Sequence, residues 1–594
     1  MSFILQIFYS VISGLLLSLA IPNELYLLGS PAVAFVAIIP LYIVFSNCKS
    51  YKNAFWLMFI QVFTTHMTSS FWLAFFKDFA VFTLGASALA TAAIGGFCGL
   101  LIFIPFSKFN KTDSWKLETF SLYKPVYRQS FFRIIYFAAA YTVYEWVKSI
   151  GFLGYPWGTV SSSMFRFKWF IQLADITGTY GITFLTVLFN SILGELLCLF
   201  AICKKNDSGK KLFKDVVWTA GLFAVLFVCT MGYGAWQYNL TRTPVKQLTT
   251  VMVQINQDPW REGDLTESIL VQEKMSEESI ARLKEQDKKP ELIVWSEGSL
   301  SGFFPGAKTY YEWSPTEKPF IDFVKDNNTP VLVGGGVAVN NEIIFHGEKI
   351  NHKKLYNSAL MFNSKGEYCG YYGKLHLVPF AESIPFIDNP IIKKIMMKLV
   401  HISSGWHKGE NLTYFEIPCT VLDEKYNTYV QNINVTYPEA YKLPSVKIAT
   451  PICFDDAFTD VMRPLSLNGA ELFVNITDDS WSLKRSSEYQ HFCIAAYRAI
   501  EYRTTLVRST NAGYSVVVDP SGKILADMPL FTTQSMEYDV PVFQKVTTIY
   551  AALGNWVPYL FYVLIIGTMF MIIKHFRYES KTVICSRKFK NKKK

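Results

Sequence analysis

The sequence lacks several patterns that define common classes of protein. Its 594 residues contain no CxxC pair of the zinc-binding kind, no Walker loop and no helix of the DNA-recognition kind. The glycines at 334–336 lack the spacing of a dinucleotide-binding fingerprint, so we interpret them as the tight end of a strand. Nucleic acid is therefore not an expected partner, and the sequence implies no metal and no organic cofactor.

The 10 cysteines also lack the regular spacing of a disulfide framework. Four lie in apolar segments and two in basic loops. The other four are Cys369, Cys419, Cys453 and Cys493. The sequence leaves open a disulfide between Cys369 and Cys419, and only Cys453 has surroundings that suggest catalysis.

Hydrophobic residues make up 51% of the sequence and aromatic residues 16%, more than a soluble enzyme carries unless lipid covers much of its surface. Apolar runs of about 17 to 25 residues, the length that crosses a bilayer, predict eight spans. The first run has no basic start and no clear cleavage site, so we expect a membrane helix and not a removed signal peptide. The spans are expected near 1–20, 28–45, 54–76, 84–105, 131–148, 182–203, 213–236 and 555–573.

The basic residues predict how these spans are oriented in the membrane. The net charge of +10 comes from lysines and arginines that cluster in short loops beside the spans and in the tail. If the spans alternate, all four basic clusters fall on one side, which marks that side as cytoplasmic. The polar part then lies outside the inner membrane, in the periplasm, and the C-terminus lies in the cytoplasm. The spans thus divide the chain into four parts: a membrane domain (1–240), a polar domain (244–545), the eighth span (555–573) and a basic tail (574–594).

The polar domain alternates short strands with helices, which is typical of a layered α/β fold. Glu297 follows one apolar strand, Lys374 follows an aromatic hairpin segment, and Cys453 follows the alternating run 446–452. Charged residues at the ends of buried strands are costly unless they are paired or used. These three residue types form a usable catalytic set.

Each of the three has a distinct expected role. Glu297 can take the proton of a thiol, Lys374 can stabilise a tetrahedral oxyanion, and Cys453 can form a thioester. Cys453 also stands at the start of a predicted helix, where peptide dipoles favour the thiolate. The commoner role of a single cysteine is that of a small core residue.

Five segments carry a resemblance to a known family: WSEG, GKLHLVPFAE, PICFDD, NITDDSW and QHFCIAAYRAIEYRTTLVRSTNAGYS. Together they resemble the carbon-nitrogen hydrolase (nitrilase) superfamily, and specifically its membrane-embedded branch, the apolipoprotein N-acyltransferases. The resemblance covers nearly the whole chain. It implies a nitrilase-like α-β-β-α sandwich beside the helical bundle, a catalytic triad of Glu297, Lys374 and Cys453, and Glu382 as the residue that orients Lys374 and the base.

The resemblance implies further positions around the site. Trp157, in the aromatic loop GYPWG, is expected near the active-site entrance, or it is a simple interfacial anchor. Trp260 is expected near an acyl pocket, or it is ordinarily buried. Four charged residues of the last segment are expected to form a buried ion network that supports the strands: Arg498, Glu501, Arg503 and Arg508.

Two stretches depart from the family pattern. Phe454 and Asp455 stand where a tyrosine and a glutamate are usual, and Gly373 and Leu375 flank Lys374 where a histidine and an arginine are commoner. The polar shell around Cys453 is therefore expected to be arranged differently. The tyrosine-rich stretch 426–443 is an insertion to which the sequence assigns no role.

The expected function is N-acylation of the diacylglyceryl-modified N-terminal cysteine of apolipoproteins, with a phospholipid as acyl donor and a Cys453 thioester as intermediate. This is the last step of bacterial lipoprotein maturation. A membrane-tethered amidase and a non-catalytic lipoprotein-binding protein stay open as alternatives. A transporter is disfavoured because the predicted spans contain few acidic residues, among them Glu145 and Glu195.

Overall fold

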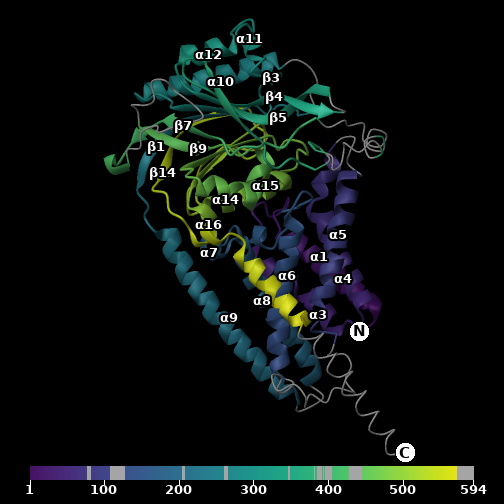
Figure 1. Cartoon of the computed structure of the whole chain (residues 1–594). Helices are drawn as coiled ribbons and strands as arrows, with labels where there is room; N and C mark the ends of the chain where they lie inside the picture. Colours follow the sequence, from purple (N-terminus) through teal and green to yellow (C-terminus); the bar gives the residue numbers. More distant parts are fainter. Residues whose placement is uncertain are drawn as a thin grey trace, which may run out of the picture.

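The helices and strands form two parts, a helical bundle and a sandwich of two β-sheets (Figure 1). Several predicted features lie outside the described residues: Trp260, the stretch 427–443, the tail 574–594 and most residues of the basic clusters. The computed structural model describes residues 1–76, 82–107, 127–203, 208–259, 265–345, 348–379, 381–383, 391, 394, 405–426 and 444–570.

The bundle has a helix at each predicted span. The span predicted near 28–45 is divided into two helices, because Pro40 opens a new first turn there. The last helix, Trp556–Phe570, packs on the bundle through ring contacts of Tyr559 with Trp146 and of Phe561 with Phe184. The others are α1 (Phe3–Ala20), α2 (Pro31–Ala37), α3 (Ile39–Asn47), α4 (Tyr51–Ser69), α5 (Ser87–Ile102), α6 (Tyr127–Ser149), α8 (Thr179–Cys203) and α9 (Ser208–Asn239).

Length and apolar composition qualify four helical segments of the described chain as membrane spans, and two shorter apolar helices accompany them. α4 and α6 occupy predicted positions but carry more polar residues. Several of these are buried inside the bundle, among them Gln61, Thr65 and Glu145. The four qualifying segments are Phe3–Ala20, Thr83–Ile102, Thr179–Phe200 and Phe213–Asn239, and the shorter two are Pro31–Asn47 and Trp556–Phe570.

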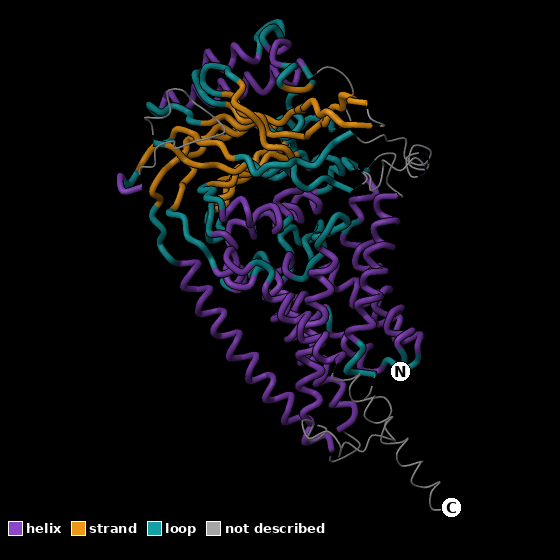
Figure 2. The backbone as a smooth tube through the Cα atoms, in the orientation of Figure 1, coloured by secondary structure: helices purple, strands orange, loops and turns teal. Residues whose placement is uncertain are grey.

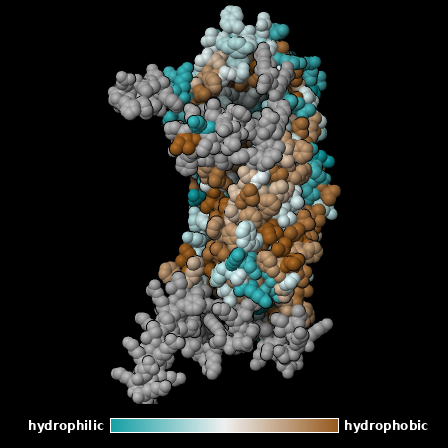
Figure 3. All heavy atoms as spheres, turned by 90° about the vertical axis from the view of Figure 1, so that its right-hand side faces the viewer, coloured by the Kyte–Doolittle hydropathy of each residue, from teal (hydrophilic) through white to brown (hydrophobic). Residues whose placement is uncertain are grey.

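The outer surface of the bundle is apolar. Figure 3 shows hydrophobic side chains gathered over the helical part, while hydrophilic ones are more frequent toward the sandwich. A surface of this kind suits contact with lipid, because the membrane interior cannot hydrate polar groups. On α9 the exposed apolar side chains are Phe213, Val217, Trp218, Leu222, Val225, Leu226, Val228 and Trp236.

Two sheets form the sandwich. The first has the order β14-β1-β2-β4-β5-β6, with β3 beside β4 and β8 beside β1, and the second has the order β13-β12-β11-β10-β9-β7. The strands of the first are β1 (Pro244–Gln254), β2 (Leu292–Trp295), β3 (Phe303–Phe304), β4 (Val331–Phe345), β5 (Glu348–Phe362), β6 (Tyr368–Gly373), β8 (Thr420–Val421) and β14 (Gln534–Phe543); those of the second are β7 (Tyr414–Pro418), β9 (Ser445–Ala449), β10 (Leu472–Thr477), β11 (Thr505–Thr510), β12 (Val516–Val518) and β13 (Ile524–Asp527).

Helices cover the outer faces of both sheets, which gives the α-β-β-α order (Figures 1 and 2). Alternate residues of β1 separate two cores: Val251 packs outward in the cluster with α10 and α12, and Met252 packs inward in the cluster with the second sheet. The second sheet is covered by the helices that face the bundle. The first sheet carries α10 (Thr266–Glu285), α11 (Lys308–Tyr311) and α12 (Phe320–Asn327); the second carries α14 (Thr459–Leu467) and α15 (Arg485–Tyr502).

The glycines at 334–336 lie inside β4 and not at a strand end, so the sequence-based interpretation was wrong. A Cβ on Gly334 would lie 2.5 Å from the Cα of Glu297 and 2.6 Å from the nitrogen of Gly298. Both partners are main-chain atoms, which cannot move aside as a flexible side chain can. Gly334 therefore allows β4 to lie directly against the turn that presents Glu297.

We expect Gly334→Ala to lower the thermal unfolding midpoint of the full chain in detergent by several degrees, because the added methyl group overpacks backbone by an estimated ~1–3 kcal/mol. Gly221→Ala is the matched control: Gly221 lies within α9 with open space at its Cβ position. That change should leave the midpoint equal or slightly higher. Equal midpoints for Gly334→Ala and the wild type would contradict the argument.

Candidate active site

Three strands bring the predicted catalytic residues to one edge of the sandwich. Glu297 follows β2, Lys374 directly follows β6, and Cys453 follows β9. β2 is parallel to β4, and β6 runs the same way because it is separated from β4 by the antiparallel β5. The carboxyl ends of such strands are the usual place for a site in α/β folds.

Lys374 lies at the centre of the polar contacts. Its Nζ is 3.2 Å from Oε1 of Glu297 and 2.8 Å from Oε1 of Glu382, and only 1% of its side chain is exposed. Asn357 on β5 donates from Nδ2 to the same two carboxylate oxygens, at 2.7 and 2.9 Å. Sequence reasoning missed Asn357, which lies inside a strand without any motif around it.

Main-chain groups fix the second oxygen of each carboxylate. The N–H of Asp478 donates to Oε2 of Glu297 at 3.0 Å, and the N–H of Val378 donates to Oε2 of Glu382 at 2.8 Å. Both carboxylates are therefore held on two sides, which leaves little freedom for either to turn away from Lys374.

Cys453 is the first residue of the 3-10 turn η9 (Cys453–Ala457) and has a φ of +45°, a left-handed backbone value rare for residues with a side chain. Burial raises the pKa of its thiol well above the ordinary value, although the Lys374 charge opposes this. The expectation of a thiolate at a helix start was therefore wrong: one short 3-10 turn does not offset the loss of water. The resting group is a thiol, and its activation needs a base.

The surroundings of Lys374 favour its charged form, whereas those of Cys453 favour the neutral form. Burial alone would lower the pKa of its ammonium, but the Cys453 sulfur in its ionised form and the carboxylates of Glu297 and Glu382 raise that pKa well above the ordinary value. The lysine therefore stays charged beside the thiol. A permanent cation at this place can stabilise negative charge that develops during a reaction.

Asp455, one of the two residues after Cys453 that depart from the family pattern, connects separate parts of the site. The Asp455 carboxylate accepts hydrogen bonds from Tyr372 Oη (2.9 Å) and from the N–H groups of His376 (2.7 Å) and Ile452 (3.1 Å). It thereby ties the segment after Lys374 to the turn of the nucleophile. Burial raises the pKa of Asp455 to about 7.

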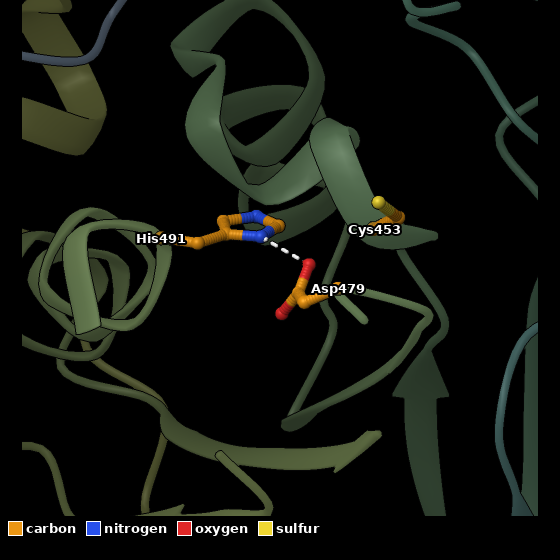
Figure 4. A group of neighbouring side chains, drawn as sticks. All are labelled: Cys453, Asp479 and His491. Atoms are coloured by element: carbon orange, nitrogen blue, oxygen red, sulfur yellow. Dashed lines mark hydrogen bonds and ion pairs between the residues drawn. The ribbon is translucent and has the colours of Figure 1, made fainter. Parts of the chain in front are cut away.

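A second group of charges lies on the other side of Cys453. His491 on α15 binds Asp479 at 2.7 Å and Asp456 at 2.9 Å, and Arg508 binds the same two carboxylates, each at 2.5 Å. Figure 4 shows Asp479 turned toward the imidazole. One ligand-type atom from each of Cys453, Asp479 and His491 falls within 4.8 Å of the others.

This group is poorly suited to hold a metal ion, although its spacing would fit one. Both nitrogens of His491 are already bonded to carboxylates, and Asp479 is bonded to Arg508. Burial alone would lower the pKa of His491, but Asp479 and Asp456 raise it to about 9, so the imidazole is protonated and offers no lone pair.

Comparison with known families matches both parts of the chain. The profile described as "Apolipoprotein N-acyltransferase N-terminal domain" matches residues 13–192, and the profile "Carbon-nitrogen hydrolase" matches residues 250–548. A protein of Treponema denticola named apolipoprotein N-acyltransferase 2 is 39% identical over 96% of this chain and 98% of its own length. The chain belongs to the apolipoprotein N-acyltransferase family.

Other relatives bearing the same name span most of the chain. A Treponema pallidum protein is 34% identical over 92% of this chain and 91% of its own, and a Borreliella burgdorferi protein is 26% identical over 91% of both. Among solved structures, an amidase from Nesterenkonia sp. is 15% identical, with a TM-score of 0.31 over 51% of this chain and 93% of that one.

The charged residues of the predicted ion network and the two cysteines of the possible disulfide can also be compared with the structure. The four charged residues predicted as one ion network form separate pairs instead: Arg498 with Glu501, Arg503 with Asp175, and Arg508 with Asp456 and Asp479. Arg498 and Glu501 lie on α15, Arg503 directly follows α15, and Arg508 lies on β11. They therefore meet different neighbours, which spacing alone does not reveal. Cys369 and Cys419 are both free thiols.

The charged group beside Cys453 predicts a pH effect on stability. A raised histidine pKa contributes stability that is fully present below the unfolded value of about 6.5 and is lost as the pH rises through about 9. The full contribution is about 3 kcal/mol. We therefore expect the thermal midpoint to fall from pH 7 to pH 9.5 in the wild type, and this part of the fall to be absent in His491→Gln. Parallel curves for the two proteins would contradict the assignment of a charged imidazole.

Proposed function

We propose that the protein transfers an acyl chain from a phospholipid to the α-amine of the diacylglyceryl-modified N-terminal cysteine of lipoproteins. The observation that carries the proposal is the assembly of Glu297, Lys374 and Cys453 at one edge of the sandwich, in a chain whose relatives bear the name apolipoprotein N-acyltransferase. The roles of these residues follow from their contacts.

In the first step, Glu297 takes the proton of the Cys453 thiol while the sulfur attacks the sn-1 ester carbonyl of the phospholipid. The Lys374 ammonium, together with the N–H of Phe454 in the first turn of η9, stabilises the oxyanion. The bond between the carbonyl carbon and the glycerol oxygen then breaks. Protonated Glu297 returns its proton to that oxygen, and a lysophospholipid leaves a thioester on Cys453.

In the second step, the amine of the lipoprotein attacks the thioester carbonyl. Glu297 accepts the amine proton, the carbon–sulfur bond breaks, and the sulfur regains a proton as the amide forms. Glu382 contacts Lys374 and not the reacting atoms, so its role is to orient the ammonium. Asp455 and Phe454 hold the turn that carries Cys453.

Both substrates are lipids, which accounts for the helical bundle. We propose that all eight predicted spans cross the inner membrane, with the sandwich on the periplasmic side and the C-terminus in the cytoplasm. The apolar outer surface of α9 and the buried polar groups of α4 and α6 support this arrangement. An apolar surrounding also protects a thioester from water.

Intact-mass measurement of the full chain with a phospholipid tests the proposal. We expect a mass gain of one acyl chain on Cys453 that neutral hydroxylamine removes. Cys453→Ala should show no adduct, and Glu297→Gln and Lys374→Met should form it at least about a hundredfold more slowly, because each removes one essential part of the first step.

The alternatives give other outcomes in the same experiment. A folded wild type without any adduct, but with ammonia released from small amides, would indicate an amidase. A folded wild type that binds lipoprotein without adduct or turnover would indicate a binding protein. An adduct that persists in Cys453→Ala would contradict the proposed nucleophile.

A further inference from the structure

A loop of the bundle contacts two residues that lie next to Cys453. The ring of Trp157 stacks on Phe454, the neighbour of Cys453, with centroids 5.1 Å apart and planes 14° apart. It also lies 5.5 Å from the ring of His491, whose imidazole is near the sulfur. Trp157 is only 6% exposed, so it is not a simple anchor at the lipid surface.

Two buried charges at the end of α6 hold this loop by its backbone. Nζ of Lys148 donates to the carbonyl oxygens of Trp157 at 2.9 Å and Gly158 at 3.3 Å. The carboxylate of Glu145, one helical turn earlier, accepts the N–H of Val160 at 2.8 Å. Lys148 thus binds two carbonyl oxygens and Glu145 binds one N–H group, all within the four loop residues 157–160.

The arrangement is a strong constraint because it is buried. Lys148 is 4% exposed and Glu145 is 1% exposed. Hydrogen bonds to charged groups are stronger than neutral ones, and they strengthen further away from water. The second oxygen of Glu145 accepts from Thr183 on α8 at 2.7 Å, which fixes the carboxylate to a second helix. These contacts tie the loop backbone to α6, and through Glu145 to α8.

The indole N–H of Trp157 is a donor that a bound molecule could use. Its Nε1 is buried and has no acceptor among the residues that the structure describes. A buried donor without a partner destabilises the protein, and an oxygen atom of a bound molecule would remove that cost. The ring stacks on Phe454, the residue after the nucleophile, so the ester group of a lipid bound at Cys453 would come close to it.

We propose that Glu145 and Lys148 are positioning residues that lock the loop so that Trp157 walls the thiol pocket and offers its indole N–H to an ester oxygen of the phospholipid. The pair acts through Trp157 and touches no reacting atom. This inference rests on the proposed thioester chemistry, and it adds a substrate contact and the device that holds it.

The test measures the rate of thioester formation in the full chain, against the concentration of a phosphatidylethanolamine with a labelled sn-1 chain. We expect Lys148→Met to slow acylation about tenfold or more, because a small displacement of a site wall is costly. Lys148→Arg keeps a charged donor and should restore most of the rate. Trp157→Phe keeps a ring but loses the N–H, so it should raise the half-saturating lipid concentration by about two- to tenfold.

A double-mutant comparison separates positioning from general destabilisation. In a Trp157→Ala background, Lys148→Met should add little further loss, because both changes remove the same wall. Lys168→Met is the matched control: Lys168 also donates to a backbone carbonyl, that of Gly522 at 2.9 Å, away from Trp157. It should leave the acylation rate within about twofold of the wild type.

Each outcome decides the inference. Independent, additive losses for Lys148→Met and Trp157→Ala would overturn it, as would a wild-type rate in Lys148→Met or an equal loss in Lys168→Met. If Lys148→Met does not fold, Glu145→Gln takes its place, with the same coupling to Trp157→Ala expected. Failure of the wild type itself to form a thioester would instead contradict the proposed function.

Discussion

The rest of the site depends on the buried contact of one ammonium with two carboxylates. Lys374 bonds Glu297 and Glu382 in a place where its side chain is almost completely removed from water. Burying three charges is costly, and their mutual attraction offsets that cost only with good geometry and further hydrogen bonds. Asn357 and the N–H groups of Asp478 and Val378 supply those bonds. The same attraction keeps the lysine charged beside a thiol that burial keeps neutral.

Neighbouring networks hold this contact from three directions. Asp455 ties the segment after Lys374 to the turn of Cys453, and the His491–Arg508 group fixes Asp479 next to the residue whose N–H binds Glu297. From the bundle, Lys148 holds the loop whose tryptophan stacks on Phe454. The bundle and the sandwich thus meet at Phe454, the residue directly after the nucleophile.

The sequence predicted what depends on local pattern. Apolar run lengths located the helices, alternation indicated short strands in the polar domain, and strand-end residues with family motifs identified Glu297, Lys374 and Cys453. It did not predict features that depend on contacts between distant segments. Asn357 stands on an ordinary strand, Gly334 is required by a backbone approach from β2, and the pairing of Arg503 with Asp175 joins residues far apart in the chain. The neutral thiol also depends on burial, which is a property of the folded site.

We propose that the acyl group on Cys453 is transferred to an amine faster than water hydrolyses the thioester. The most direct measurement isolates the acyl-enzyme and divides it between buffer alone and buffer with a synthetic peptide that begins with diacylglyceryl-cysteine. We expect rapid loss of the thioester with amide product on the peptide, and slow loss without the peptide. Loss at the same rate in both, with free fatty acid as the product, would contradict it.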